Sequence, residues 1–168
     1  MATTYKLISS VTVGSGSAAS IDFTSIPSTY TDLLLRYSLR SNRGIVVDGI
    51  NISFNGSTSN FTGVYLEGSG STAISSTSTR FAGVVSADTS TASTFGNGDI
   101  YIPNYTGSKN KSFSGTSVSE NNSTAAYADF NAVLWSDSAA ITSISVTPFV
   151  GTLFYQYSTA YLYGISNA

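Results

Sequence analysis

Apolar and polar residues alternate along much of this chain with a period of two, which is the period of a half-buried β-strand. In Asp32–Arg40 one face carries Leu33, Leu35, Tyr37 and Leu39. Residues Ala126–Trp135 show a similar alternation over ten positions. The segments that we expect to form strands are Thr4–Val13, Ser20–Phe23, Asp32–Arg40, Gly49–Asn55, Phe61–Glu67, Arg80–Ala87, Asp99–Pro103, Ser112–Ser119, Ala126–Trp135, Ile144–Thr147 and Thr159–Ile165.

Turn-forming residues separate these segments. Asn55-Gly56 and Asn97-Gly98 are pairs that tolerate the positive φ angles of tight turns. The three prolines stand at the margins of expected strands, where the missing N–H is tolerated. Many short strands with such turns predict an all-β fold, an antiparallel β-sandwich that we expect to be jelly-roll-like. An immunoglobulin-like sandwich is disfavoured because the Cys–Trp–Cys pattern is absent.

The whole chain, residues 1–168, is expected to form a single domain, with a short N-terminal arm at residues 1–6. Two Ser/Thr-rich stretches, Gly68–Thr79 and Ser86–Thr94, are interpreted as surface loops because each is short and flanked by strand sequence. A short helix or turn is expected around Ser25–Thr31.

Composition then narrows the classes of function. The chain has no histidine and no cysteine, and only 10% of its residues are charged, whereas 41% are hydrophobic and 12% aromatic. Histidine is the usual general base and the commonest metal ligand, and cysteine is the usual thiol nucleophile. This composition favours a structural or binding protein over an enzyme, and it predicts no cofactor.

The net charge of −2 and the scattered cations argue against a nucleic-acid partner, which requires a dense basic surface. No apolar run resembles a secretory signal or approaches the roughly 18 residues that a membrane span requires. We therefore expect a protein made in the cytoplasm, without a signal peptide and without a membrane partner.

The nine acidic residues are spread along the chain and form no calcium-loop motif, so no metal site is predicted. A Ser–His–Asp triad is excluded by the missing histidine. A glycosidase would need two carboxylates a few ångströms apart. Asp129, Asp99 and Glu67 lie in or at the edges of expected strands, but their spacing gives no reason to expect a pair. An enzyme such as a depolymerase is thus a weaker hypothesis than either of the two non-enzymatic functions considered below.

The remaining candidates are surface residues that could form an interface. Tyr127 and Trp135 lie opposite the Ala126–Leu134 face of their strand, and we expect them to point outward, although the pattern does not settle which face is buried. Exposed aromatics stack on sugars and anchor protein interfaces. The loop from Arg40 to Asp48 contributes the polar candidates for a subunit or partner contact, which are Arg40, Arg43 and Asp48.

Several runs along the chain share a pattern with one class of proteins. They are Phe23–Arg36, Ile50–Gly56 followed by Tyr65-Leu66, Asp99–Tyr105, Ser138–Ile144 and Thr159–Ile165. Together they resemble recurring segments of tailed-bacteriophage virion structural proteins, a class that includes capsid decoration and tail-fibre-like β-sandwich proteins. The resemblance implies a non-enzymatic component of the virion exterior with a β-sandwich fold, and it brings no catalytic residues.

Two functions are consistent with that resemblance. The first is a capsid decoration or cement protein that stabilises the head as a homo-oligomer, with a trimer favoured, through contacts with capsid or other virion proteins. The alternative is a tail-fibre or tail-spike module that binds host surface glycans through Tyr, Trp and Asn side chains. The position on the particle and the partner are left open.

Overall fold

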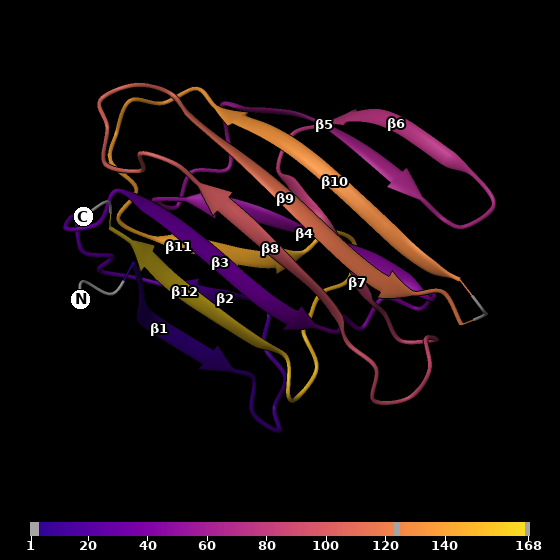
Figure 1. Cartoon of the computed structure of the whole chain (residues 1–168). Helices are drawn as coiled ribbons and strands as arrows, with labels where there is room; N and C mark the ends of the chain where they lie inside the picture. Colours follow the sequence, from indigo (N-terminus) through magenta and orange to yellow (C-terminus); the bar gives the residue numbers. More distant parts are fainter. Residues whose placement is uncertain (1–3, 123–124, 167–168) are drawn as a thin grey trace.

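Two antiparallel sheets make up the computed structural model, which describes residues 4–122 and 125–166. Figure 1 looks onto the larger sheet, with the smaller sheet behind it. The larger sheet contains, in spatial order, β1 (Tyr5–Thr12), β12 (Thr159–Ile165), β3 (Asp32–Leu39), β8 (Gly96–Ile102), β9 (Lys111–Glu120), β10 (Ala126–Trp135), β5 (Phe61–Gly68) and β6 (Ala73–Ser78). The smaller sheet contains β2 (Ile21–Phe23), β11 (Ile144–Pro148), β4 (Val47–Phe54) and β7 (Phe81–Ser86).

The chain passes repeatedly between the two sheets. Strands β1, β3 and β5 belong to the larger sheet, whereas β2, β4 and β7 belong to the smaller one. Every pairing between neighbouring strands is antiparallel. This arrangement confirms the expected all-β antiparallel sandwich.

The alternation of apolar residues explains how the sheets pack. In β3 the side chains of Leu33, Leu35 and Leu39 are fully buried between the sheets, while Arg36 on the other face is exposed. An aromatic cluster fills one end of the core, where the Phe54 ring of β4 meets the Trp135 ring of β10 at 5.4 Å between centroids. Such aromatic pairs contribute about 1 kcal/mol beyond the area that they bury.

Glycines allow the sheets to approach closely beside Tyr37. The Tyr37 hydroxyl is buried and lies next to Gly83 of β7 and Gly98 of β8, where a Cβ atom on either glycine would collide with it. Gly83 also has a φ of 136°, which side-chain-bearing residues rarely adopt. Burial raises the pKa of the Tyr37 hydroxyl well above its ordinary value. This neutral, buried phenol is a structural element of the core.

The sequence located eleven of the twelve observed strands, with boundaries shifted by a few residues at most sites. β6 was missed, because Gly68–Thr79 was interpreted as a loop whereas residues Ala73–Ser78 pair with β5. Within the described residues the segment Ser25–Thr31 contains no helix and is irregular, with bends at Ser25, Ser28 and Thr31. Residues 1–3 of the expected N-terminal arm lie outside the described residues, and Tyr5 and Lys6 belong to β1. The described part of the chain offers no helix suited to crossing a membrane.

Candidate binding cleft between the two sheets

Trp135 is buried, so the outward orientation expected for it is wrong. Its side chain is 1% exposed and packs against Phe54 and Phe61. The face of β10 that points outward is the one that carries Phe130 and Leu134. Tyr127 lies on the same inner face as Trp135 and lines the space between the sheets, so the outward orientation expected for Tyr127 is wrong as well. Both faces of this strand contain large apolar side chains, and the indole is the largest of them. The bulkiest ring therefore occupies the space between the sheets, and the alternation alone could not identify that face.

Arg40 is also buried, and it makes contacts within the chain rather than presenting a free cation. Its guanidinium donates hydrogen bonds to the backbone carbonyls of Asp88, Ser90, Thr91 and Thr94 at 2.7 to 3.0 Å. All four acceptors belong to the loop between β7 and β8. Arg40 therefore holds this loop in place, and its proposed role at the surface is wrong.

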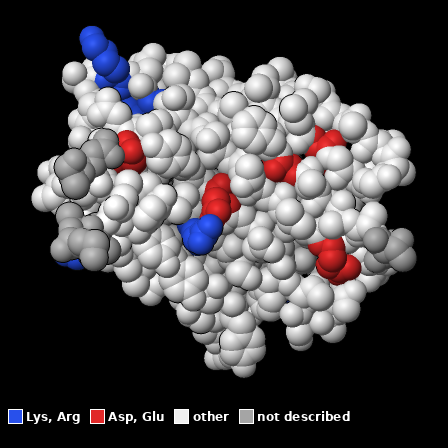
Figure 2. Space-filling view, viewed as in Figure 1, with Lys and Arg blue, Asp and Glu red and all other residues white. Residues whose placement is uncertain are grey.

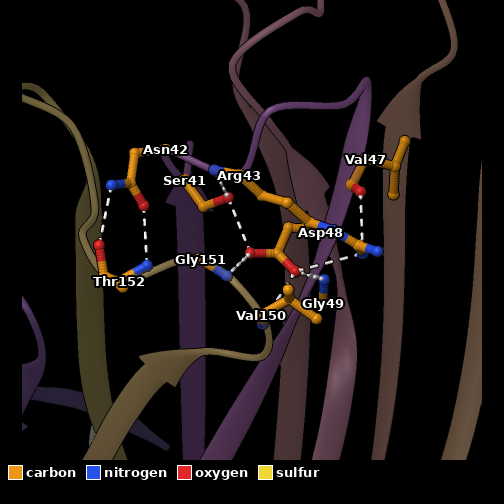
Figure 3. A network of polar contacts seen from close by, with 9 residues as sticks. All are labelled: Ser41, Asn42, Arg43, Val47, Asp48, Gly49, Val150, Gly151 and Thr152. Atoms are coloured by element: carbon orange, nitrogen blue, oxygen red, sulfur yellow. Dashed lines mark hydrogen bonds and ion pairs between the residues drawn. The ribbon is translucent and has the colours of Figure 1, made fainter.

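Asp48 is the centre of a network of polar contacts that joins the loop before β4 to the loop after β11 (Figure 3). Its carboxylate is fully buried and accepts four hydrogen bonds at 2.8 to 3.2 Å. The donors are the Ser41 hydroxyl and the backbone N–H groups of Gly49, Val150 and Gly151. The Arg43 guanidinium lies 3.6 Å away. Asp48 is thus a structural clamp, and its carboxylate is already hydrogen-bonded within the chain.

Asn42 completes the connection between these loops. Its side-chain carbonyl accepts a hydrogen bond from the Thr152 N–H at 2.8 Å, and its amide donates to the Thr152 hydroxyl at 2.9 Å (Figure 3). The two loops are therefore fixed relative to each other at both ends of the network. Arg43, with its side chain 33% exposed, is the one member of the predicted Arg40, Arg43 and Asp48 set that still reaches solvent.

A cleft of about 410 Å³ opens beside this network, between the two sheets. The smaller sheet ends at β7, which packs against β8, β9 and β10 of the larger sheet. The larger sheet continues past this edge to β5 and β6, and this difference in width creates the cleft. The inner face of β5 is therefore only partly covered. We call this space the inter-sheet cleft, and three of the five predicted interface residues line it, namely Arg43, Asp48 and Tyr127.

Aromatic rings form one part of the cleft wall. Tyr65 of β5 and Phe81 of β7 lie 4.9 Å apart between ring centroids, and Phe149 meets Phe81 edge-on at 5.8 Å. Gly49 makes room for this arrangement, since a side chain there would collide with the Phe81 ring. Phe149 is half-exposed, so its ring is available at the mouth of the cleft. Neither Tyr65, Phe81 nor Phe149 stands in a sequence pattern that marks it as a binding residue.

Polar groups without partners form another part of the wall. The Glu67 carboxyl lines the cleft and has no hydrogen-bond or ion-pair partner among residues 4–122 and 125–166. Burial raises the pKa of Glu67. The hydroxyl groups of Tyr65 and Tyr127 likewise make no hydrogen bond within that part of the chain. A ligand in the cleft would therefore meet aromatic rings and unused polar groups together.

A second carboxyl lies directly behind Glu67, which the spacing in the sequence did not predict. Asp129 of β10 is the register partner of Glu67, and both side chains point to the inner face. Burial, with the nearby Glu67 charge adding to it, raises the pKa of Asp129 to about 6. Asp129 is only 4% exposed and does not line the cleft. The pair therefore does not place two carboxylates on one bound substrate, as glycoside hydrolysis requires.

Within the residues that the structure describes, no three acidic, histidine or cysteine side chains gather as ligands for a metal ion. Compared with protein-family models, with curated proteins and with solved structures, the chain shows no match.

Proposed function

We propose that this protein is a non-enzymatic structural component of a virus particle that binds neighbouring proteins through the outer face of its eight-stranded sheet. The observation that carries the proposal is an exposed apolar surface on that face. The resemblance of several sequence runs to tailed-phage virion proteins supplies the class of partner. The leading assignment is a capsid decoration or cement protein.

The apolar surface consists of side chains from three neighbouring strands, and we call it the outer apolar patch. Its members are Val64, Leu66, Val118, Phe130 and Leu134, each 38 to 57% exposed. Phe130 is the register partner of Leu66 across β10 and β5, so these two side chains lie side by side. Contiguous exposed apolar surface of this kind is uncommon on monomeric proteins and marks interaction sites.

Few charges interrupt this face of the molecule, as Figure 2 shows. Arg36 of β3 and Asp99 of β8 form a bidentate ion pair at 2.7 and 2.9 Å, which neutralises both. The Asp99 carboxylate raises the pKa of the Arg36 guanidinium. A nearly neutral face gives up few hydrated charges when a partner covers it, which favours protein association.

The edge strands support assembly with further copies. Three of the four sheet edges carry features that discourage pairing: β1 has an irregular register after Leu7, β2 is three residues long, and β7 is buried throughout. Strand β6 has none of these features and is exposed over its first five residues, without a charged side chain. An unprotected edge beside the outer apolar patch favours the homo-oligomer that we expect, with a trimer favoured.

Localisation on purified particles by cryo-electron microscopy tests this function. Density at three-fold or quasi-three-fold positions of the capsid supports the cement assignment, whereas density at the tail tip moves the function to host recognition. Absence of the protein from particles contradicts both.

A double variant, Leu66→Ser with Phe130→Ser, probes the outer apolar patch itself. Both side chains are exposed, so the fold should survive, while particle occupancy should fall sharply. Phe149→Ser is the matched control, because it removes an equally exposed ring from a different surface. If particles lacking the protein withstand heat and osmotic shock as well as complete ones, stabilisation is not its role.

A further inference from the structure

We propose that the inter-sheet cleft is a binding site for a neutral saccharide, whose apolar ring face packs against the aromatic wall while its hydroxyl groups bond to Glu67. The site is distinct from the outer apolar patch, so the inference does not rest on the structural role proposed above.

The size and position of the cleft fit a small ligand. Its volume of about 410 Å³ lies within the usual range of roughly 300–1,000 Å³ for such sites. The hydrogen bonds that centre on Asp48 fix one wall, and the paired strands β5 and β10 form the other. Both walls are therefore held before a ligand arrives, which lowers the entropic cost of binding.

The aromatic wall suits one face of a sugar ring. Phe149 is 50% exposed and is held edge-on against Phe81, which in turn packs on Tyr65. The C–H groups on one face of a pyranose ring are apolar, so their contact with these rings removes apolar surface from water. The contact needs little further ordering, because the three rings already support one another.

The polar groups in the cleft wall explain why a saccharide fits better than an apolar ligand. An apolar ligand would bury the Glu67 carboxyl and the Tyr65 and Tyr127 hydroxyls without partners, and each buried polar group left unpaired costs about 1–3 kcal/mol. Sugar hydroxyls both donate and accept, so they satisfy a carboxyl and a phenol alike.

The charges in the cleft disfavour an anionic ligand. The Arg43 guanidinium lies 3.6 Å from the Asp48 carboxylate, so these two charges form a pair. Glu67 is the third charged residue in the cleft wall, and it has no cationic partner among the described residues. A uronic or sialic acid would place its carboxylate close to Glu67 and be repelled. A neutral polyol avoids that repulsion, and its hydroxyl groups can donate hydrogen bonds to the Glu67 carboxyl.

The test is titration of the whole protein with defined disaccharides, followed by saturation-transfer NMR and calorimetry. The probes are maltose, cellobiose, lactose and N,N′-diacetylchitobiose, with glucuronic acid and a short aliphatic peptide as comparisons. We expect at least one neutral disaccharide to bind with a Kd at or below about 1 mM, a typical strength for a single small site.

Two cleft variants and one matched control connect binding to the site. Phe149→Ala and Glu67→Ala should each weaken binding by about tenfold or more, whereas Phe130→Ala, which removes a ring of similar exposure from the outer apolar patch, should leave it unchanged. Glu67→Gln keeps the shape of the side chain and should bind more tightly than Glu67→Ala, provided that both are folded by circular dichroism.

Three results would overturn the inference. The first is no binding of any neutral disaccharide up to about 10 mM, a concentration that would reveal even weak affinity. The second is an equal response of Phe149→Ala and Phe130→Ala. The third is tighter binding of glucuronic acid or the peptide than of every neutral sugar. None of these results bears on particle localisation, so the two proposals fail separately.

Discussion

Asp129 and Glu67 stand directly opposite each other on the neighbouring strands β10 and β5, with both side chains on the inner face of the sheet. One Asp129 oxygen accepts a hydrogen bond from the Asn131 amide at 2.9 Å, while the other has no partner within the described residues. Two like charges in register between strands repel each other. The sandwich therefore contains a carboxyl that is costly to ionise in the folded state.

The first prediction concerns stability against pH. Burial, with Glu67 adding to it, raises the pKa of Asp129 to about 6, above the value of about 3.9 in an unfolded chain. The folded state then binds the proton more tightly, so its stability falls as pH rises from about 4 through about 6. The difference corresponds to about 3 kcal/mol. Chemical denaturation at several pH values between 4 and 8 measures it.

The variant Asp129→Asn isolates this contribution. We expect it to be more stable than the natural chain at pH 7 and to show a shallower decline between pH 4 and pH 7. Asp22→Asn, which changes an exposed carboxylate, is the control. An unchanged slope in Asp129→Asn would show that another group causes the pH dependence.

The second prediction concerns the clamp at Asp48. Asp48→Asn replaces an oxygen that accepts hydrogen bonds with an amide that donates them, so at least one buried donor loses its partner. We expect a loss of about 3 kcal/mol. For a chain of this length the melting temperature should fall by about 10 °C. Calorimetry compares it with Asp99→Asn, which breaks an exposed ion pair and should cost less than about 1 kcal/mol.

The third prediction concerns the loop that Arg40 holds. Arg40→Lys keeps the positive charge but cannot reach four carbonyls at once, because an ammonium lacks the planar fork of a guanidinium. Amide hydrogen exchange in residues 88–94 should become faster, with little change elsewhere. Arg80→Lys is the matched control, since the Arg80 side chain makes no hydrogen bond or ion pair within the described residues. Equal exchange in both variants would contradict the assigned role.

The fourth prediction uses Trp135, the single tryptophan of the chain, as a reporter. Because its side chain is buried against Phe54 and Phe61, its fluorescence should resist quenching by acrylamide until the protein unfolds. Saccharide binding at the inter-sheet cleft should leave that fluorescence unchanged. Strong quenching of the native protein would place the indole at the surface.

Truncation of the same residue measures its part in the core. Trp135→Ala should cost about 3–5 kcal/mol, as is usual for a large buried aromatic. Trp135→Phe should cost less, because the indole Nε1 has no acceptor among the described residues and no hydrogen bond is lost. Urea denaturation compares the two variants, and equal costs would show that ring volume is not what the site requires.

Strand positions followed from the sequence where one face of a segment was clearly apolar. In β3 the leucines are buried and Arg36 is exposed, as the alternation indicated. The prediction was wrong for β6, since the two apolar residues of Ala73–Ser78 are adjacent rather than alternating and the segment forms a strand through its pairing with β5. A strand that depends on its neighbour rather than on a buried face leaves no periodic signal.

The candidate site could be predicted only in part. Arg43, Asp48 and Tyr127 were proposed from the sequence and line the cleft, but Asp48, like Arg40 and Trp135, is buried. A charged residue in a polar loop resembles a surface residue until its partners are known, and those of Asp48 include Gly151, about a hundred positions away. Phe149 was not a candidate because it stands in no motif, and Glu67 was weighed only as a possible member of a carboxylate pair, which its spacing gave no reason to expect.

The sequence by itself determined the all-β class, most of the strand positions and the scarcity of catalytic groups, since periodicity, turn residues and composition are local properties. Only the tertiary structure decided which face of β10 is buried, that Glu67 and Asp129 are neighbours, and that the sheets leave a cleft beside β5. The physical reason is that strand register and sheet width arise from pairing between distant segments. Whether a side chain is exposed depends on what those segments cover.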